Sequence, residues 1–439
     1  MKVMKFGGTS VGKPERMHHI VDLVTSQSEP AIIVLSALSG TTNALVEIIY
    51  NIAKGDRTSA KQNIDKLEQH YQVFINDLVK KPEALHQAKA IIAEHFEFLN
   101  IILKISFSEA LSKDILAQGE LLSTKLFSTY LGEQKVDHVL LPALEFMTID
   151  YNDEPQIGSI KVKLTQLLKQ HPGKRLFVTQ GYICRNARGE VDNLKRGGSD
   201  YSASLIAAAI NASVCEIWTD IDGMHNNDPR IVKKTKPVEQ LSFEEAAELA
   251  YFGAKILHPA SIWPAQQYKI PVKLLNTMQP EAKGTMIAEE AGSVGVKAVA
   301  AKDNIIAIRI KSSRMLLAYG FLRKVFEVFE KYRTSIDMVT TSEVAVSLTI
   351  DNASHLKEIQ KELEPFGAVE IDENQVIISV VGNEISKTAN IVKKLFESIQ
   401  NIPVRMVSYG GSPHNISLLV PAAYKTQILQ QLNKGMFDL

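Results

Sequence analysis

The chain has 439 residues, of which 45% are hydrophobic and 22% are charged, and Lys plus Arg equals Asp plus Glu at 49 each. This length predicts two or three domains, and this composition is typical of a soluble globular protein. The balanced charge gives no electrostatic reason to expect nucleic acid or an anionic membrane as a partner. The two cysteines, Cys184 and Cys215, are too few for a disulfide framework or a metal site and fit buried thiols in a reducing compartment. The first residues lack the pattern of a signal peptide, and no apolar run reaches the roughly 18 residues of a membrane span, so we expect a cytoplasmic protein.

The first two-thirds of the chain alternates short apolar runs with longer helical patterns. The expected strands are residues 3–6, 31–35, 139–141, 176–179, 215–219 and 272–275. Several of them are apolar on both faces, which is typical of buried parallel strands. Strands that alternate with helices predict an α/β fold with a mostly parallel sheet covered on both faces. Ligands bind such sheets beyond the carboxyl ends of the strands, so we expect a site where small polar residues follow the strands, at 7–10, 36–40, 180–181 and 220–223.

Residues from about 58 to 112 predict helix throughout, because they are rich in Ala, Leu, Lys, Glu and Gln and contain no Gly. We expect a helical insertion beside the sheet, with its charges on a solvated face.

The pattern changes near Gly292, after which the elements are short and regular. The expected strands are 296–301, 305–311, 336–340, 344–350, 368–371, 375–381, 404–409 and 415–420, and the expected helices are 319–332, 354–363, 387–399 and 423–432. Their order resembles two copies of a βαββαβ unit. The first copy, 305–371, is complete, whereas the second, from 375 onward, lacks one strand that the run 296–301 can supply. The sequence therefore predicts a domain 1–292 followed by a region 296–439 in which the first unit is inserted in the second.

The first motif is Lys5-Phe6-Gly7-Gly8-Thr9-Ser10, directly after a strand. Paired glycines let a phosphate approach the backbone, whose N–H groups can cradle it, and Lys5 adds a positive charge. Residues 7–13 also fit G-x-x-x-x-G-K, but Pro14 stands where a P-loop needs Ser or Thr, so a Walker A loop is disfavoured. A plain glycine turn between strand and helix is the alternative.

The second motif is Lys195-Arg196-Gly197-Gly198-Ser199-Asp200, before the helical run 201–212. Ser199 or Asp200 suits the helix cap, and the exposed N–H groups at the helix start attract an anion. The guanidinium of Arg196 matches a carboxylate, and Asp200 can accept from an ammonium. Acid and base so close together suit a zwitterion such as a free amino acid, and a capped helix with surface charges is the alternative.

Two further motifs are weaker. Residues 218–223, with Asp228-Pro229-Arg230 after them, follow a strand but lack the EF-hand spacing and its closing Glu, so a nucleotide-facing loop is the better interpretation. His225 taken alone is more typical of a surface histidine than of a ligand. Gly119-Glu120, near the start of a helix, carries little information by itself.

Five motifs occur in order and at approximate family spacing: KFGGTSV, RGGSD, WTDIDG with DPR, FGAKILHP at 252–259 and TTSEVAV at 340–346. With them the chain resembles the aspartate kinases of the amino-acid kinase superfamily almost end to end, and is most similar to the monofunctional lysine-sensitive type. The resemblance implies a three-layer αβα sandwich with a mostly parallel sheet, followed by two ferredoxin-like ACT units. It also implies ATP-dependent phosphorylation of the β-carboxylate of L-aspartate, the first step towards lysine, threonine and methionine, under feedback by an end product.

The resemblance implies roles for individual residues. Contacts to phosphate and transition state fall on Lys5, Gly7 and Gly8. The aspartate pocket falls on Ser36, Thr42, Glu120, Arg196, Gly197, Ser199 and Asp200, with Glu120 and Asp200 at the amine and Arg196 at the α-carboxylate. The ATP site falls on Thr219, Asp220, His225, Arg230, Lys255 and Ile256. The effector site falls on Met315, Ala318, Phe321, Leu322, Asp337, Ser342 and Glu343.

Three residues depart from the family pattern. Lys195 stands where the family often has Gly, which removes freedom from the loop, and His225 stands where it often has Tyr. Ala318 replaces a Ser that contacts the effector in lysine-sensitive relatives, and the lost hydroxyl weakens the case for lysine.

The implied cofactors are ATP and Mg²⁺, with Mg²⁺ carried by ATP and no metal site on the protein. A β-carboxylate with a pKa of about 4 is already ionised at neutral pH, so no general base is required. The implied partners are L-aspartate, ATP, an amino-acid effector (lysine, or else threonine) and a second copy of the chain bound through the ACT units. We expect no appended dehydrogenase domain. The alternatives are another amino-acid kinase, such as a glutamate kinase, and a catalytically inactive amino-acid sensor.

Overall fold

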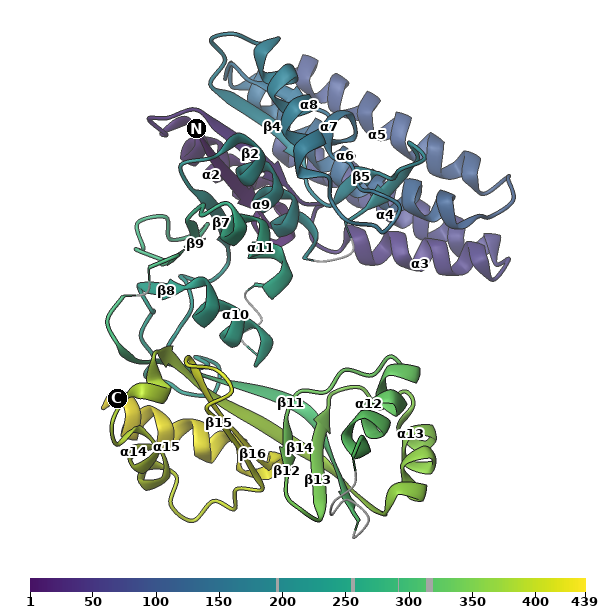
Figure 1. The fold of residues 1–439 in the computed structure, drawn as a ribbon. Helices are drawn as coiled ribbons and strands as arrows, with labels where there is room; N and C mark the ends of the chain where they lie inside the picture. The colour runs from purple at the N-terminus through teal and green to yellow at the C-terminus, as the bar shows by residue number, and fades with distance from the viewer. Residues whose placement is uncertain (195–196, 254–256, 291, 313–318) are drawn as a thin grey trace. The chain divides into compact units, whose positions relative to one another are not determined.

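The computed structural model describes residues 1–194, 197–253, 257–290, 292–312 and 319–439 (Figure 1). The chain forms two compact units, Met1–Met224 with Leu257–Glu289, and His225–Ile256 with Glu290–Leu439. Residues 225–256 thus pack with the C-terminal part of the chain. The division into a catalytic domain 1–292 and a regulatory region 296–439 is a different division and stays a prediction. Within the described residues, no helix combines the length and the apolar character needed to cross a membrane.

The first unit is built on a mostly parallel sheet. Its strands are β1 (Lys2–Phe6), β2 (Ala31–Leu35), β3 (Val139–Leu141), β4 (Leu176–Gln180), β7 (Cys215–Thr219), β9 (Val272–Asn276) and β10 (Thr285–Ala288). They lie in the order β3-β4-β2-β1-β7-β9-β10, and all neighbours are parallel except β9 and β10. The register pairs Phe6 with both Leu35 and Trp218, and Leu35 with Gln180, so the carboxyl ends meet at one edge. The expected strands are confirmed to within one residue, and β10 was not expected.

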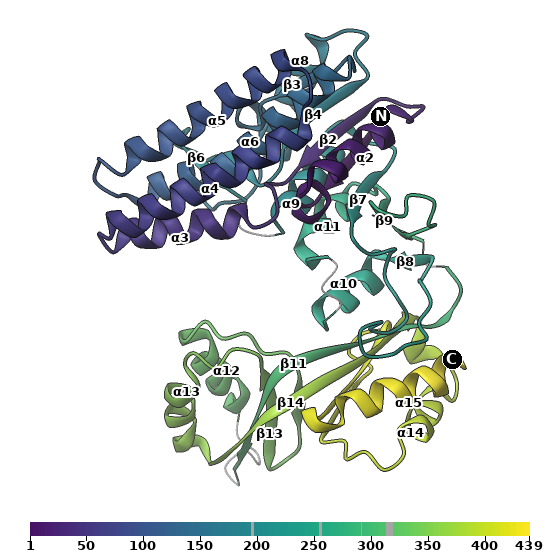
Figure 2. The same cartoon turned by 180° about the vertical axis from the view of Figure 1, so that it is seen from behind.

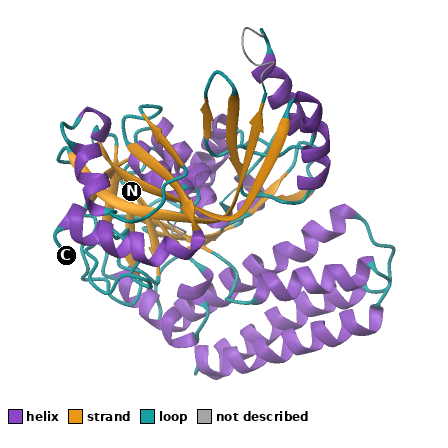
Figure 3. Cartoon of the chain, turned by 90° about the horizontal axis from the view of Figure 1, so that it is seen from below, coloured by secondary structure: helices purple, strands orange, loops and turns teal. Residues whose placement is uncertain are grey.

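Helices cover this sheet. They are α1 (Gly8–Val11), α2 (Pro14–Thr25), α3 (Thr41–Ala53), α4 (Arg57–Leu78), α5 (Pro82–Ile102), α6 (Glu109–Glu133), α7 (Ala143–Phe146), α8 (Ile157–Lys169), α9 (Gly198–Ile210) and α11 (Pro259–Gln267), with a small hairpin of β5 (Ile183–Arg185) and β6 (Val191–Asn193). The long helices α3 to α6 lie side by side (Figures 2 and 3). One core cluster joins residues of β1 and β2 to this helical group, for example Phe6, Ile33, Ile48 and Phe127.

The expectation of unbroken helix from 58 to 112 is wrong. Helix α4 ends at Leu78, α5 begins at Pro82, and α6 begins only at Glu109. Proline has no N–H and is favoured at the first turn of a helix, so Pro82 starts a new helix instead of continuing the old one. Ser108 accepts from the Leu111 N–H and caps α6.

The second unit contains a six-stranded sheet. Its strands are β11 (Gly295–Lys311), β12 (Val339–Thr341), β13 (Ala345–Ile350), β14 (Ala368–Asn383), β15 (Met406–Tyr409) and β16 (Asn415–Pro421), in the order β12-β13-β11-β14-β16-β15 with antiparallel neighbours. The unit also contains β8 (Gln240–Ser242), α10 (Phe243–Tyr251), α12 (Phe321–Lys331), α13 (Leu356–Leu363), α14 (Ile391–Ser398) and α15 (Lys425–Phe437). Figure 1 shows α12 and α13 beside one half of the sheet and α14 and α15 beside the other.

The strands expected at 296–301 and 305–311 are in fact one strand, β11, and those expected at 368–371 and 375–381 are one strand, β14. The two long strands pair with each other, and the junctions are absorbed as register shifts near Lys302 and Ile305. Asn304 and Asn374 adopt positive φ there, a conformation that Asn tolerates better than most residues. Separate strands were therefore the wrong expectation.

The topology is that of two ferredoxin-like βαββαβ units that share the long strands. The first uses the second half of β11, α12, β12, β13, α13 and the first half of β14. The second continues through β14, α14, β15, β16 and α15, and the first half of β11 takes its missing strand position, with Ala298 opposite Val381 and Ala301 opposite Ile378. Each half has its own hydrophobic cluster. The α/β fold class with two ferredoxin-like units is confirmed.

Candidate active site at the strand ends

Lys5 and Asp200 form an ion pair at the carboxyl edge of the parallel sheet. Lys5 is the penultimate residue of β1 and Asp200 lies in the first turn of α9. The distance from Lys5 Nζ to Asp200 Oδ1 is 2.5 Å, and the two side chains are only 11% and 18% exposed. A Cβ at Gly7 would lie 3.2 Å from the Lys5 ammonium, so the ammonium lies beside the glycine backbone. A Cβ at Gly8 would lie 3.1 Å from the Ala37 carbonyl, which places the turn after β1 against the loop after β2.

The start of α9 lies against the loop after β2 and against helix α11. The Ser36 hydroxyl, after β2, donates to Ser199 Oγ at 2.9 Å. Gly197, at the N-cap of α9, has φ +67°, and a Cβ there would lie 2.5 Å from the Ser261 Cβ. Both the left-handed backbone and the close approach of α11 therefore require glycine at this position.

Glu120 brings a buried carboxylate to the same edge. It lies on α6 and is 4% exposed, and its Oε1 accepts from the Ala37 N–H at 3.3 Å. Its other oxygen, Oε2, is buried and has no hydrogen-bond partner among the described residues. Burial raises the pKa of Glu120 to about 8. An unpaired buried carboxylate oxygen is costly, and a ligand ammonium would satisfy it.

Thr42 differs from the other expected pocket residues in its exposure. It is exposed on the first turn of α3, whereas its neighbour Thr41 is buried and shares a hydrogen bond of 3.0 Å with the Tyr71 hydroxyl. Thr41 thus supports the position of α3, while the Thr42 side chain faces solvent.

Tyr182 is a further side chain at this edge that the sequence did not single out. It follows Gln180-Gly181 at the end of β4 and adopts φ +65°, an uncommon value for a bulky residue. Its N–H donates to Ser202 Oγ at 2.7 Å, and burial together with the charge of Glu120 raises its pKa to about 12. The polar pair before it was the only signal, because a positive φ leaves no mark on a tyrosine in the sequence.

The expected ATP residues are divided between the two units. Thr219 ends β7, donates to the exposed Asp220 carboxylate at 3.2 Å, and accepts at its carbonyl from the Thr277 N–H at 2.8 Å. His225 and Arg230 belong to the second unit. His225 Nδ1 lies 2.7 Å from Thr235 Oγ1, and Arg230 forms a two-pronged pair with Asp228 at 2.9 and 2.8 Å.

The segment that carries His225 and Arg230 is anchored on the C-terminal helix of its unit. Asn226 donates to Asn433 Oδ1 at 3.2 Å, and Asn227 donates to the Leu429 carbonyl at 2.9 Å. These buried amides hold the segment on α15. Arg196, Lys255, Ile256, Met315 and Ala318, together with Lys195, lie outside the described residues.

The described effector residues do not converge within one chain. Phe321 and Leu322 begin α12, and Asp337 precedes β12 with its N–H bonded to the Thr349 carbonyl at 2.9 Å. Ser342 and Glu343 form the exposed turn between β12 and β13, where the Ser342 N–H bonds the Ala345 carbonyl at 2.8 Å. Asp337 and Ser342 therefore lie at opposite ends of β12.

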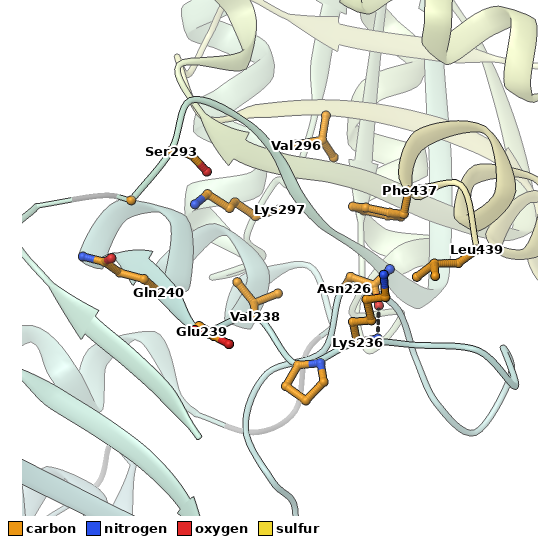
Figure 4. Close-up of a pocket in the computed structure, with 12 residues that line it drawn as sticks. Asn226, Lys236, Val238, Glu239, Gln240, Ser293, Val296, Lys297, Phe437 and Leu439 are labelled. Atoms are coloured by element: carbon orange, nitrogen blue, oxygen red, sulfur yellow. Dashed lines mark hydrogen bonds between the residues drawn. The ribbon is translucent and has the colours of Figure 1, made fainter. Parts of the chain in front are cut away.

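A pocket of about 460 Å³ lies elsewhere, within the second unit. Figure 4 shows Phe437 and Leu439 of the C-terminal end beside Asn226 and Lys236, with Lys297 also in its wall. None of the described residues expected at the active or effector site lines it. The described residues also contain no cluster of three or more His, Cys, Asp or Glu able to hold a metal ion.

The comparisons with known proteins cover the whole chain. The model of the amino acid kinase family matches residues 1–276, and an ACT domain model matches 378–436. The lysine-sensitive aspartokinase 3 of Escherichia coli K12 is 33% identical over 450 residues, which is 99% of each chain. The chain belongs to the aspartokinases of the amino acid kinase family. The chloroplastic aspartokinase 3 of Arabidopsis thaliana is 35% identical over 99% of this chain and 81% of that one.

Solved aspartokinases have the same fold. E. coli aspartokinase III in complex with aspartate and ADP gives a TM-score of 0.83 at 32% identity, with 100% of both chains covered. The aspartate kinase of Clostridium acetobutylicum gives 0.86 at 24% identity, with 99% of this chain and 100% of that one covered, and supports the fold alone. The fold predicted from five short motifs is thus that of the aspartokinases.

Proposed function

We propose that the chain transfers the terminal phosphoryl group of ATP to the β-carboxylate of L-aspartate, giving 4-phospho-L-aspartate and ADP. The observation that carries this proposal is the likeness along the whole chain to E. coli aspartokinase III, which was solved with aspartate and ADP bound. The Lys5–Asp200 pair and the unpaired Glu120 oxygen, at one edge of the sheet, are the kind of charges that the reaction needs.

In this proposal no side chain acts as a general base, because the attacking carboxylate is already ionised. The barrier comes from two anions that approach each other. Phosphoryl transfer is helped mainly by positioning and by fixed positive charge. The Lys5 ammonium and the backbone N–H of Gly8 supply that charge, and Asp200 holds the ammonium in place beside the glycines. The Gly7 N–H donates to the Trp218 carbonyl at 3.4 Å, so Gly7 contributes mainly the room for a phosphate to approach the backbone.

The substrate is gripped at both ends. Glu120 and Asp200 take the ammonium of aspartate, Arg196 takes the α-carboxylate, and the remaining pocket residues are Ser36, Thr42, Gly197 and Ser199. The nucleotide contacts Thr219, Asp220, His225, Arg230, Lys255 and Ile256.

Mg²⁺ enters this proposal as the companion of ATP. Mg²⁺ usually keeps several waters and binds through substrate phosphates, so we expect the nucleotide phosphates to hold the ion. When bound, it supplies further positive charge at the phosphates, while Lys5 and the glycine turn supply the charge of the protein itself.

The ACT units carry the effector, for which lysine is the first candidate and threonine the second. E. coli aspartokinase III, also solved in complex with lysine and aspartate, gives a TM-score of 0.82 at 32% identity. The contacts are Met315, Ala318, Phe321, Leu322, Asp337, Ser342 and Glu343. Strand β12 stands first in the strand order of its sheet, where it also lies close to β15, and Asp337 and Ser342 lie at its two ends. Antiparallel pairing of β12 with a second copy would bring them together, which supports a homodimer. We place this enzyme in the cytoplasm.

The test is ADP release with ATP, Mg²⁺ and each of aspartate, glutamate and succinate. Succinate lacks the amine and leaves Glu120 unpaired, so its kcat/KM should be about 100-fold lower or worse. Glutamate should also be a poor substrate, because its reactive carboxylate is one methylene too far from the amine. Turnover of succinate equal to that of aspartate would reject the assignment, and no ADP release at all would favour the inactive sensor.

A further inference from the structure

Asp337 is a buried carboxylate with two different oxygens. Its side chain is 1% exposed. Oδ1 receives the Lys302 ammonium at 2.6 Å and the Tyr251 hydroxyl at 2.8 Å. Oδ2 is buried and has no hydrogen-bond partner among the described residues. Asp337 therefore has one oxygen with two donors and one enclosed oxygen that no described residue uses.

Lys302 is shared between two carboxylates. Its ammonium lies 2.6 Å from Asp337 and 2.9 Å from Asp351 Oδ2, and 4.3 Å from the centre of the Tyr251 ring. Burial lowers the pKa of Lys302, but the hydrogen bonds to Asp337 and Asp351 outweigh it and leave that pKa above its usual value. The cation thus stays charged and has a second partner, about 40% exposed, towards which it can shift.

Tyr251 connects Asp337 to a segment that we assign to ATP. It is the last residue of α10, a helix that begins with a capping box at Ser242 and Glu245. Two residues later, Gly253 has φ +117°, and a Cβ there would lie 2.0 Å from the Ala301 carbonyl, next to Lys302 in β11. The end of α10 is therefore held on the strand that carries Lys302, immediately before the positions of Lys255 and Ile256.

We propose that Tyr251 and Lys302 are the positioning residues that couple the effector to nucleotide binding through Asp337. The free oxygen of Asp337 binds the ammonium of a free amino acid, and the occupied oxygen then releases Tyr251 and the end of α10. This inference rests on the proposed function, because it takes Asp337 as an effector contact.

The physical reason is competition for one negative charge. A carboxylate neutralises one cation well, and a second ammonium at Oδ2 repels Lys302 across a buried site where charges are weakly screened. Lys302 shifts towards Asp351, and the bonds at Oδ1 weaken together. Lys302 thus sets the affinity for the effector. Tyr251 transmits effector binding to the end of α10, which precedes the residues that we assign to ATP.

The experiment uses the full chain and two substitutions, Tyr251→Phe and Lys302→Met. Tyr251→Phe removes the hydroxyl and keeps the ring under Lys302. Tyr409→Phe is the matched control, because Tyr409 is 47% exposed against 42% for Tyr251, and its hydroxyl donates to the Ser386 carbonyl at 2.7 Å in the same unit. The readouts are the KM for ATP as a function of lysine concentration and the shift in melting temperature that lysine produces.

Tyr251→Phe should keep kcat without lysine within about twofold and should still bind lysine, while the increase of KM for ATP caused by lysine falls about fivefold or more. Lys302→Met should lower the half-saturating lysine concentration about fivefold or more, because the competing cation is gone. Tyr409→Phe should behave as the unchanged chain. A purely structural role of Tyr251 would change the melting temperature but not separate lysine binding from inhibition.

Inhibition of Tyr251→Phe by lysine to the same extent and at the same concentration as the unchanged chain would overturn this inference and leave the kinase assignment intact. An unchanged chain that releases ADP with aspartate but responds to no lysine would overturn the inference and the effector assignment together. Absence of aspartate-dependent ADP release would instead reject the kinase itself.

Discussion

We expect a rise in pH from 6.5 to 8.5 to strengthen aspartate binding, because Glu120 must lose its proton before it can pair with an ammonium. In the folded protein, burial raises the pKa of this carboxyl to about 8. The ionised fraction then grows from about 3% at pH 6.5 to about 76% at pH 8.5. The α-ammonium of free aspartate keeps its proton over this range. The kcat/KM for aspartate should therefore increase with pH, by about 25-fold in the limit where only ionised Glu120 binds.

The assay is the initial rate of ADP release at low aspartate and saturating ATP, measured at half-unit steps of pH. Glu120→Gln should lower kcat/KM for aspartate about tenfold to a hundredfold at pH 8.5, because a bond between opposite charges is replaced by a neutral one, and should flatten the profile. The KM for ATP serves as the control, since we assign the Glu120 carboxylate to the amine of aspartate and not to the nucleotide. A flat profile in the unchanged chain, or the same slope in Glu120→Gln, would refute the assignment.

The same substitution should stabilise the protein at high pH. The pKa of Glu120 is raised in the folded state from 4.5 to about 8, so the folded state binds this proton more tightly than the unfolded one. The free energy of unfolding therefore decreases as the pH rises from about 4.5 to about 8 and stays low above that pH. The total decrease is at most on the order of 5 kcal/mol. Glu120→Gln removes this penalty and should melt higher than the unchanged chain at pH 8.5, although it is the poorer enzyme. Equal melting temperatures at pH 8.5 would contradict the burial argument.

Three further substitutions test the strand-end site. Lys5→Ala should lower kcat about a hundredfold while far-ultraviolet circular dichroism stays unchanged, because it removes one preorganised charge at the phosphate, and a near-wild-type rate would exclude that role. Gly197→Ala should lower the melting temperature more than Gly189→Ala, since both positions have positive φ but only Gly197 meets a neighbour, Ser261, at 2.5 Å. Thr41→Val should cost about 1 kcal/mol of unfolding free energy through its lost bond to Tyr71, and equal urea midpoints before and after substitution would contradict this.

The parallel sheet was predictable because each of its strands is marked by a run of neighbouring apolar residues in the sequence. Strands buried on both faces are largely apolar, so β2 is visible as an unbroken apolar run with polar residues after it. The apolar run of β7 is interrupted by Glu216, whose buried carboxylate pairs with the Lys2 ammonium at 2.9 Å. Pro82 is a local signal for the break between α4 and α5, because proline is favoured in the first turn of a helix and disfavoured in its interior. Strand β10 was missed because four residues at the antiparallel edge carry too little pattern.

The site residues were predictable only by resemblance, and their environment was not. Gly119-Glu120 carries no local signal, and the unpaired oxygen that makes Glu120 informative depends on residues from α6 and the loop after β2. The partners of Asp337 are also far away in the sequence: Lys302 is 35 residues from it and Tyr251 is 86 residues from it. No periodicity connects such positions, so only the folded chain brings them together.

The packing of residues 225–256 predicts that an effector changes nucleotide binding more than aspartate binding. The amino acid kinase model extends to residue 276, yet this segment packs with the C-terminal unit. It is held there at both ends, by Asn226 and Asn227 on α15 and by Tyr251 on Asp337. A rearrangement of that unit would therefore act on His225 and Arg230, which we assign to ATP. Lys5, Glu120 and Asp200 belong to the other unit, together with the ATP residues Thr219 and Asp220. Lysine should accordingly raise the KM for ATP more than the KM for aspartate, and an equal rise in both would show that the coupling runs by another route.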